Sequence, residues 1–552
     1  MGRLRLIPGV FALLALTAPV APADEPHQHQ HSYPPGDPQK LGKVSFPVSC
    51  NDAAREKFGR GVALLHSFWY DEAEKTFNEV LAADPSCAMG HWGIAMSVFQ
   101  PIWAAPAPEQ WKRGLAAVEK LRAAPPKTPR ERDWADAAAS YYANADTLDH
   151  PARKRAFAEA MERLSRRHPE DPEAAIFHAL ALVGVGMDHP TDKTYAYQKK
   201  AAAILNRILP EQPEHPGIAH YLIHSFDYPA LAELALPAAR AYSKIAPDSP
   251  HALHMPSHIF TRLGLWKDSI ASNLVSADAA KRHVARTQPG AASFDQVHAL
   301  DYLEYAYLQT GQDRKAAEVV KEIGAVEKLD LPNFAAAYAL AAVPARHALE
   351  LRRWSEAASL SVRPATFPWD RYPYAEAITH FAKAIGAARS GDPTRAREAV
   401  AKLEALQKGL VGKDAYWADQ VEIQRRAAAS HLALAEGKKE DALALARSAA
   451  DLEGSTEKHP VTPGAILPAR EMLADMLLEL GQPKQALAEY EASLATAPGR
   501  FQGLLGAARA AGRAGEGEKA RRYYENVAAL CEESEGTRPE LAEVKSKLAL
   551  VN

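Results

Sequence analysis

A period of 34 residues constrains the fold of this 552-residue chain more than any other feature of the sequence. At several places a glycine stands five residues before an alanine or a serine. Glycine readily adopts the left-handed backbone conformation that ends a helix, and a small residue lets the next helix pack closely. The pattern therefore predicts an array of helical hairpins that share a continuous core. The pairs are Gly264/Ser269, Gly311/Ala316, Gly391/Ala396, Gly437/Ala442, Gly481/Ala486 and Gly515/Ala520.

Other parts of the chain follow the same period. The residues at matching offsets are Ala201, Ala235 and Ser269, with Pro213 and Pro247 closing two units, and Gly61, Ala73, Phe77 and Pro85 in the first unit. These spacings resemble the tetratricopeptide repeat (TPR), a helix-turn-helix unit with small, aromatic and proline residues at such offsets. The resemblance extends over about residues 52–534. It implies an all-α fold, a right-handed superhelical solenoid of TPR hairpins.

We divide the chain into five parts. Residues 1–23 are typical of a signal peptide, with Arg3 and Arg5 before a short apolar run and small residues before Asp24. Residues 24–51 are expected to form an extended N-terminal segment. We predict an N-terminal TPR array with irregular insertions at 52–283 and a C-terminal TPR array at 294–534. Residues 535–552 are expected to be a C-terminal helix or tail.

The segments 64–73 and 254–260 resemble a widespread group of exported bacterial repeat proteins. This resemblance implies a periplasmic or secreted protein and carries over no catalytic role. The apolar run near the start is shorter than the ~20 residues that a spanning helix needs, and no later segment resembles a membrane span.

Cys50 and Cys87 flank the first predicted hairpin, and Cys531 is the third cysteine. In an oxidising compartment we expect a disulfide between Cys50 and Cys87 that fastens this hairpin. Three unpaired, buried thiols are the alternative.

Charge and motifs exclude several classes of function. The formal net charge is −3, so the sequence lacks the basic surface that nucleic acids require. The sequence contains no Gly-rich phosphate loop, no zinc-protease helix with paired histidines around a glutamate, and no nucleophile elbow. No reaction is specified, and it stays open whether the chain is an enzyme.

Histidines recur where the resemblance places the concave groove. In TPR proteins the second, fifth, ninth and twelfth residues of each first helix line the groove, because steps of three and four stay on one helix face. We take Ala235 as the small residue of one unit's second helix to set the register. The predicted groove residues of three consecutive units are then His220, His224 and Asp227; His251, His254 and His258; and His298 and Asp301.

Imidazole is a common ligand of zinc, copper and iron, and two histidines one turn apart can reach the same ion. His220, His224, His254 and His258 are therefore candidate metal ligands, and we expect Asp227 or Asp301 to orient them. A polar binding groove without metal is the main alternative, and chance clustering is the third.

Weaker candidates extend this surface. His66, Trp69 and His91 belong to the N-terminal units, where aromatic residues are typical of core and groove walls. Towards the C-terminus the predicted groove residues are Glu471, Asp475 and Arg509. The tract His27, His29 and His31 can hold metal loosely, but a solvated tail is the simpler interpretation.

The sequence thus favours an exported TPR scaffold that binds a peptide, a protein or a small ligand in a histidine-lined concave groove. The alternative is a metal-binding protein or metalloenzyme with its site in that groove.

Overall fold

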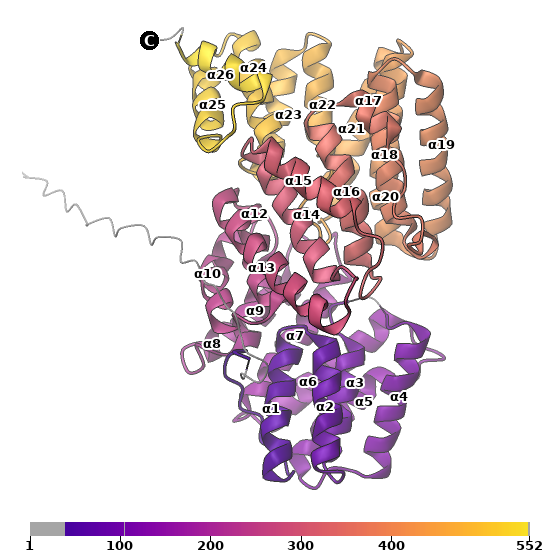
Figure 1. Cartoon of the computed structure of the whole chain (residues 1–552), viewed down its shortest axis with the longest axis vertical. Coiled ribbons are helices and arrows are strands. Elements are labelled where there is room, and N and C mark those ends of the chain that lie inside the picture. The colour runs from indigo at the N-terminus through magenta and orange to yellow at the C-terminus, as the bar shows by residue number, and fades with distance from the viewer. Residues whose placement is uncertain (1–38, 104, 550–552) are drawn as a thin grey trace, which may run out of the picture. The chain divides into compact units, whose positions relative to one another are not determined.

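The computed structural model describes residues 39–103 and 105–549, and helices dominate these ranges (Figure 1). Within them, β-structure is limited to one isolated bridge between Ala292 and Leu329. Residues Lys40–Asn552 form one compact unit. The expected all-α class is confirmed, whereas the predicted signal peptide and the histidine tract lie outside the described residues.

Consecutive helices pack against one another along the chain, as an array of helical hairpins requires. In the N-terminal part they are α1 (Asp52–His66), α2 (Tyr70–Ala83), α3 (Ala88–Phe99), α4 (Pro108–Ala123), α5 (Pro129–Tyr142), α6 (His150–Arg167), α7 (Pro172–Met187), α8 (Ala196–Ile208), α9 (Pro216–Phe226), the 3-10 helix η1 (Ala232–Ala235), α10 (Leu236–Ile245), α11 (Pro250–His254), α12 (Pro256–Arg262) and α13 (Trp266–Thr287). In the C-terminal part they are α14 (Phe294–Gln309), α15 (Asp313–Gly324), α16 (Phe334–Glu350), α17 (Trp354–Ser359), the 3-10 helix η2 (Trp369–Arg371), α18 (Pro373–Arg389), α19 (Pro393–Leu410), α20 (Ala415–Ala435), α21 (Lys439–Ser455), α22 (Ala469–Glu479), α23 (Pro483–Thr496), α24 (Phe501–Ala514), α25 (Gly517–Leu530) and α26 (Pro539–Ala549).

The predicted glycine and small-residue pairs occupy the expected positions. All six glycines have positive φ, between 68° and 84°. Each of the small residues that follow them is buried where two helices meet. Ala235 is also buried, but it ends the short 3-10 helix η1 instead of lying inside a long second helix.

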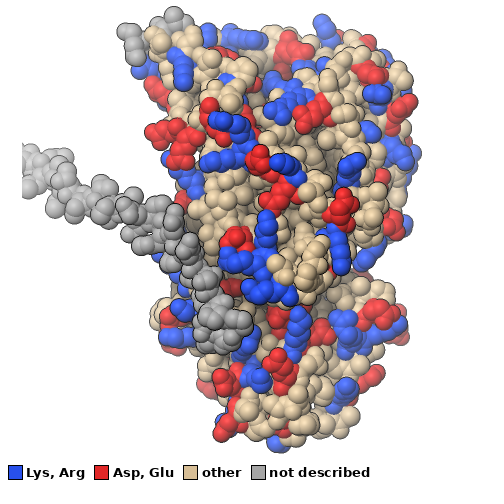
Figure 2. Space-filling model, viewed as in Figure 1, with Lys and Arg blue, Asp and Glu red and all other residues tan. Residues whose placement is uncertain are grey.

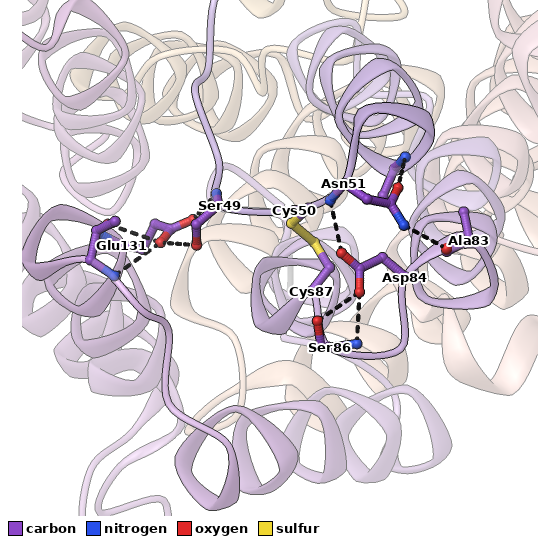
Figure 3. Close-up of a disulfide and its surroundings, with 10 residues drawn as sticks. Ser49, Cys50, Asn51, Ala83, Asp84, Ser86, Cys87 and Glu131 are labelled. Atoms are coloured by element: carbon purple, nitrogen blue, oxygen red, sulfur yellow. Dashed lines mark hydrogen bonds between the residues drawn. A yellow bond between two sulfur atoms is a disulfide. The ribbon is translucent and has the colours of Figure 1, made fainter.

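The predicted disulfide between Cys50 and Cys87 is present and joins the start of α1 to the chain that follows α2 (Figure 3). Asn51 caps α1 by accepting a hydrogen bond from the backbone of Ala54, and its amide donates to the carbonyl of Ala83. The backbone N–H of Asn51 also donates to Asp84. The first hairpin is therefore fastened by a covalent bond and by hydrogen bonds from one adjacent residue.

The core consists of two main apolar clusters. One extends from Leu41 to Phe260 and the other from Ala277 to Ala520. A loop between α21 and α22, residues 456–468, contacts both parts of the chain, and we call it the crossing loop. Glu457 of this loop accepts hydrogen bonds from Lys193 and Tyr195, at 2.6 and 2.7 Å.

Basic and acidic side chains are interspersed over the face of the molecule seen in Figure 2. Among the described residues, no helix is both long and apolar enough to cross a membrane.

Candidate metal centre

Six histidines from three successive units converge in the interior as two groups of three. The first triad is His220, His224 and His251, and the second triad is His254, His258 and His298. Within each triad, one ring nitrogen of every histidine lies within 4.8 Å of the others. The four histidines named as candidate ligands are thus divided between two sets, and each set gains a third ring from the next unit.

Local structure explains how each helix presents two rings together. His220 and His224 lie one turn apart on α9, so their side chains share a face. His254 ends α11 and His258 belongs to α12, because Pro256 lacks the N–H that would continue one helix. The chain nevertheless keeps its direction, and the Nε2 atoms of these two rings lie 3.0 Å apart.

The hydrogen bonds of the second triad fix where the ring protons lie. Nδ1 of His258 donates to Asp227 at 3.0 Å, and Nδ1 of His254 donates to Oδ1 of Asn273 at 2.7 Å. The amide of Asn273 is oriented by its own donation to the carbonyl of Ser269 at 2.7 Å. A neutral imidazole carries one proton, so both facing Nε2 atoms present lone pairs. Two lone pairs 3.0 Å apart repel each other unless a cation or a proton lies between them.

In the first triad, one ring also presents an unprotonated Nε2 to its neighbours. Nδ1 of His220 donates to the backbone carbonyl of His66 at 2.6 Å, which leaves its Nε2 unprotonated. Nε2 of His224 and Nε2 of His251 both approach that atom, each at 3.1 Å. A ring nitrogen of this kind has a single lone pair and accepts only one good hydrogen bond. Two ring nitrogens therefore compete for the one lone pair of His220 Nε2.

Burial keeps these rings neutral. Five of the six histidines are buried, and His251 is partly exposed. Burial lowers the pKa of His254 well below its ordinary value. It also lowers the pKa of His258, although the Asp227 carboxylate acts in the opposite direction. A proton is consequently a poor bridge between the facing nitrogens at neutral pH.

Asp227, at the end of α9, is held by several cationic groups. Arg262 donates to its Oδ1 at 2.8 Å, and Lys458 of the crossing loop approaches Oδ2 at 3.4 Å. Burial acts to raise the pKa of Asp227, but Lys458 and Arg262 outweigh that effect and hold the pKa far below its usual range. The aspartate is thus an ionised acceptor that orients His258.

An aromatic ring covers each triad. The ring centroid of Phe68 lies 4.2 Å from that of His220 and 5.6 Å from that of His251. The ring centroid of Tyr302 lies 4.7 Å from that of His254, and its hydroxyl donates to the carbonyl of Thr462 at 3.1 Å. Phe68 has a φ of 54°, a conformation that costs energy for a residue with a side chain.

Sequence reasoning did not select Phe68, Tyr302, Asn273, Arg262 or Lys458 for this site. The last three lie outside the predicted groove places, and Lys458 belongs to a distant loop. No local pattern in the sequence indicates that they meet the histidines.

A third cluster lies beside the first triad. Glu173 accepts hydrogen bonds from His66 at 2.9 Å and from His215 at 3.0 Å, and His66 also contacts the hydroxyl of Tyr221 at 2.8 Å. These contacts leave the nitrogens of His66 satisfied by the protein itself. His66 thus serves the first triad through its backbone carbonyl, and its ring does not join the triad.

The structure buries Asp227 and the histidines of the two triads, except for the partly exposed His251. The other charged residues predicted for the groove form ion pairs within the protein. Asp301 and Glu471 are buried, where a charge requires a counter-charge, whereas Asp475 and Arg509 are partly exposed. Asp301 binds Arg346 at 2.7 Å, so it is not available to orient a histidine. The remaining pairs are Glu471 with Arg500, Asp475 with Arg352, and Arg509 with Glu543.

Two further predicted groove residues lie apart from the triads. The ring of Trp69 packs on His283, with centroids 4.9 Å apart. His91 on α3 is only partly buried, and burial lowers its pKa.

A cavity of about 430 Å³ lies on the other side of the Asp227 network. Arg262 and Lys458 line it, together with aromatic residues that include Tyr338, Tyr416 and Trp417. The crossing loop supplies part of its wall. A ligand in this cavity would thus lie close to the carboxylate that orients the second triad.

No family model matches the chain, and no curated protein matches it. Among solved structures, a monomeric mutant of IFIT1 with Gppp-AAAA is 12% identical over 80% of this chain and 90% of that chain, with a TM-score of 0.38. The human IFIT1 dimer with PPP-AAAA is 11% identical over 88% and 96%, with a TM-score of 0.36. The P58(IPK) TPR domain is 13% identical over 68% and 99%, with a TM-score of 0.21. At these TM-scores the similarity carries no argument about a ligand.

Proposed function

We propose that this protein is a helical-repeat scaffold that binds a transition-metal ion through the imidazoles of its interior triads. The contact between His254 and His258 carries the proposal. Two Nε2 atoms that each lie about 2.1 Å from one ion are about 3.0–3.4 Å apart for bond angles between a right angle and the tetrahedral angle. Their separation of 3.0 Å falls in this range.

The surroundings of these rings support the proposal. Metal-bound histidines usually donate their second ring N–H to a carboxylate, an amide or a backbone carbonyl, which fixes the ring and the tautomer. His258 donates to Asp227 and His254 to Asn273 in this manner. The same contacts also serve a purely structural polar network, but such a network leaves the facing lone pairs without a partner.

The ligand set favours zinc or copper. Each triad consists of imidazoles alone, and imidazole suits ions of borderline softness, whereas magnesium and calcium prefer oxygen ligands. Non-haem iron sites commonly add a carboxylate to two histidines. Three protein ligands leave a coordination position for water or a substrate, so the proposal is compatible with catalysis.

Titration of tag-free protein with Zn²⁺, in competition with a chromophoric chelator, tests the proposal. The wild-type chain should bind zinc tightly, and the double variant His254→Phe/His258→Phe should bind a smaller amount of tightly held zinc per chain, because the second triad loses two of its three ligands, while far-ultraviolet circular dichroism stays unchanged. His283→Ala is the control, since His283 lies with Asp71 and Glu72 in a more exposed group that could hold an ion only loosely. An equal amount of tightly bound zinc per chain in the double variant and the wild type would refute the proposal.

The cavity supports a second function, the binding of a small ligand or a peptide segment. It combines aromatic walls with Arg262, Arg470 and Arg500, each paired with a carboxylate, which suits a polar ligand with an apolar part. Native mass spectrometry of gently purified protein tests this idea. A retained small molecule that is lost in Trp417→Ala would support it, and a chain that carries nothing and is stabilised by none of a panel of peptides and organic acids would refute it.

We further propose that the chain works outside the cytoplasm, as the signal-like start and the Cys50–Cys87 disulfide favour. Mass spectrometry of protein from the native cell should find the mature N-terminus near Asp24. An intact N-terminus with both thiols reduced would contradict this location.

A further inference from the structure

The two triads are copies of one site, produced by the helical repeat itself. We infer that the protein binds two metal ions, one in each triad, as separate centres one repeat step apart. This inference rests on the proposed function, and it adds the number of ions, their arrangement and the residues that hold each of them.

The register of the histidines carries the inference. His220 and His224 recur 34 residues later as His254 and His258, so each pair occupies the same places in its unit. The third ligand of each triad also occupies the same place in its unit. His251 stands three residues before His254, at the start of the next first helix.

The second triad is completed in the same manner one unit further along. His298 stands three residues before Asp301, which takes the place of His254 in that unit. Each triad therefore consists of two histidines four residues apart in one unit and one histidine from near the start of the first helix of the next unit. Two sites that are related by a shift of one repeat are expected to have the same arrangement of ligands.

The same register explains why the series stops after two sites. In the unit before His251 the corresponding place holds Gly217, and in the unit after His258 the paired places hold Asp301 and Tyr305. Asp301 binds Arg346, and the hydroxyl of Tyr305 accepts a hydrogen bond from Arg500 at 2.8 Å. The third unit therefore forms ion pairs and hydrogen bonds at the places where the two preceding units hold imidazoles.

The environments of the two triads are similar but not identical, since Nδ1 of His224 has no hydrogen-bond partner among the described residues, whereas Nδ1 of its repeat equivalent His258 contacts Asp227. One ring in the first triad is anchored through Nδ1 by a backbone carbonyl, and two rings in the second triad are anchored by Asp227 and Asn273. Phe68 covers the first triad and Tyr302 covers the second. Neither triad includes a carboxylate or a thiolate, so both present only neutral nitrogen ligands.

The spacing of the repeat separates the two ions. The equivalent rings of His224 and His258 have centroids 6.3 Å apart, and packed helix axes are typically about 8–10 Å apart. Ions that share a bridging oxygen in two-metal sites lie only about 3.5–4 Å apart. We therefore expect two weakly interacting mononuclear centres.

Copper is the ion of choice for the test, because Cu²⁺ binds nitrogen sites most tightly among divalent first-row metals and gives an electron paramagnetic resonance signal. Tag-free wild-type protein is loaded with Cu²⁺ in the presence of a competing chelator, and bound copper is measured per chain. The repeat-equivalent variants His251→Phe and His298→Phe each remove one ligand from one triad. Circular dichroism checks that both variants remain helical.

We expect two tightly bound copper ions per wild-type chain and one per chain in each variant. The wild-type signal should show imidazole nitrogen couplings and a dipolar broadening that disappears in both variants. One ion per wild-type chain would overturn this inference while leaving the proposed function intact. Loss of both ions in either variant would also overturn it, because it would indicate a single shared site. Absence of any tight binding would refute the proposed function itself.

Discussion

The Nε2 atoms of His254 and His258 face each other at 3.0 Å, and each ring has committed its Nδ1 hydrogen to another acceptor. An exposed pair would accommodate this contact through water or by protonation. These rings are buried, and burial disfavours the charged form. A metal ion is the partner that satisfies both lone pairs without requiring a cationic ring.

Asp227→Asn should weaken zinc binding about 10–100-fold, as loss of an orienting partner of a metal-bound histidine typically does. Asparagine can still accept the hydrogen bond from His258, but it lacks the charge that polarises the ring. Asp301→Asn is the matched control, since Asp301 is a buried aspartate of the next unit that binds Arg346. Equal losses of affinity in both variants would point to a general structural effect.

Removal of the disulfide through Cys50→Ala and Cys87→Ala should lower the free energy of unfolding by about 2–5 kcal/mol. The bond closes a loop with a sequence separation of 37 residues around the first hairpin. Thiol titration of denatured, non-reduced wild-type protein should find one free thiol, that of Cys531. Three free thiols would contradict the pairing.

Ala486→Leu should cost about 1–3 kcal/mol of stability, because the added methylenes overpack a close helix contact. Ala486 is fully buried on α23. Ala488→Leu, two residues further along the same helix at an exposed position, should change stability little. Equal melting temperatures for the two variants would show that the repeat register is wrong.

Glu304→Gln should make stability less dependent on pH. Burial raises the pKa of Glu304 from 4.5 to about 8, although Arg346 acts in the opposite direction. Between those pH values the folded state binds more protons than the unfolded state, so the wild type loses stability as pH rises from about 4.5 to about 8. The stability of the variant relative to the wild type should therefore be higher at pH 9 than at pH 5, as measured by thermal melts. A constant difference between the two would contradict a raised pKa.

The repeat was predictable because a glycine at a helix end and a small residue at a helix contact are local requirements that recur in the sequence. The six glycines with positive φ and the pairing of Cys50 with Cys87 follow from such patterns. The histidines also stood out, since their spacing repeats with the unit.

What surrounds these histidines was not predictable from the repeat. TPR geometry predicts that these histidines line a concave groove, but Phe68 and Tyr302 pack against the rings. Lys458 reaches Asp227 across a sequence separation of 231 residues, and the loop that carries it has no repeat pattern. The division into two triads depended on His251 and His298, whose places were identified but whose convergence required the packing of adjacent units.

Anomalous X-ray diffraction from crystals of the tag-free protein grown with stoichiometric Zn²⁺, recorded at the zinc absorption edge, would show directly whether the second triad holds an ion. We predict an anomalous peak about 2.1 Å from the Nε2 atoms of His254 and His258, with His298 as the third ligand. Zinc found only at surface carboxylates, with ordered His254 and His258 rings and no peak between them, would contradict the account.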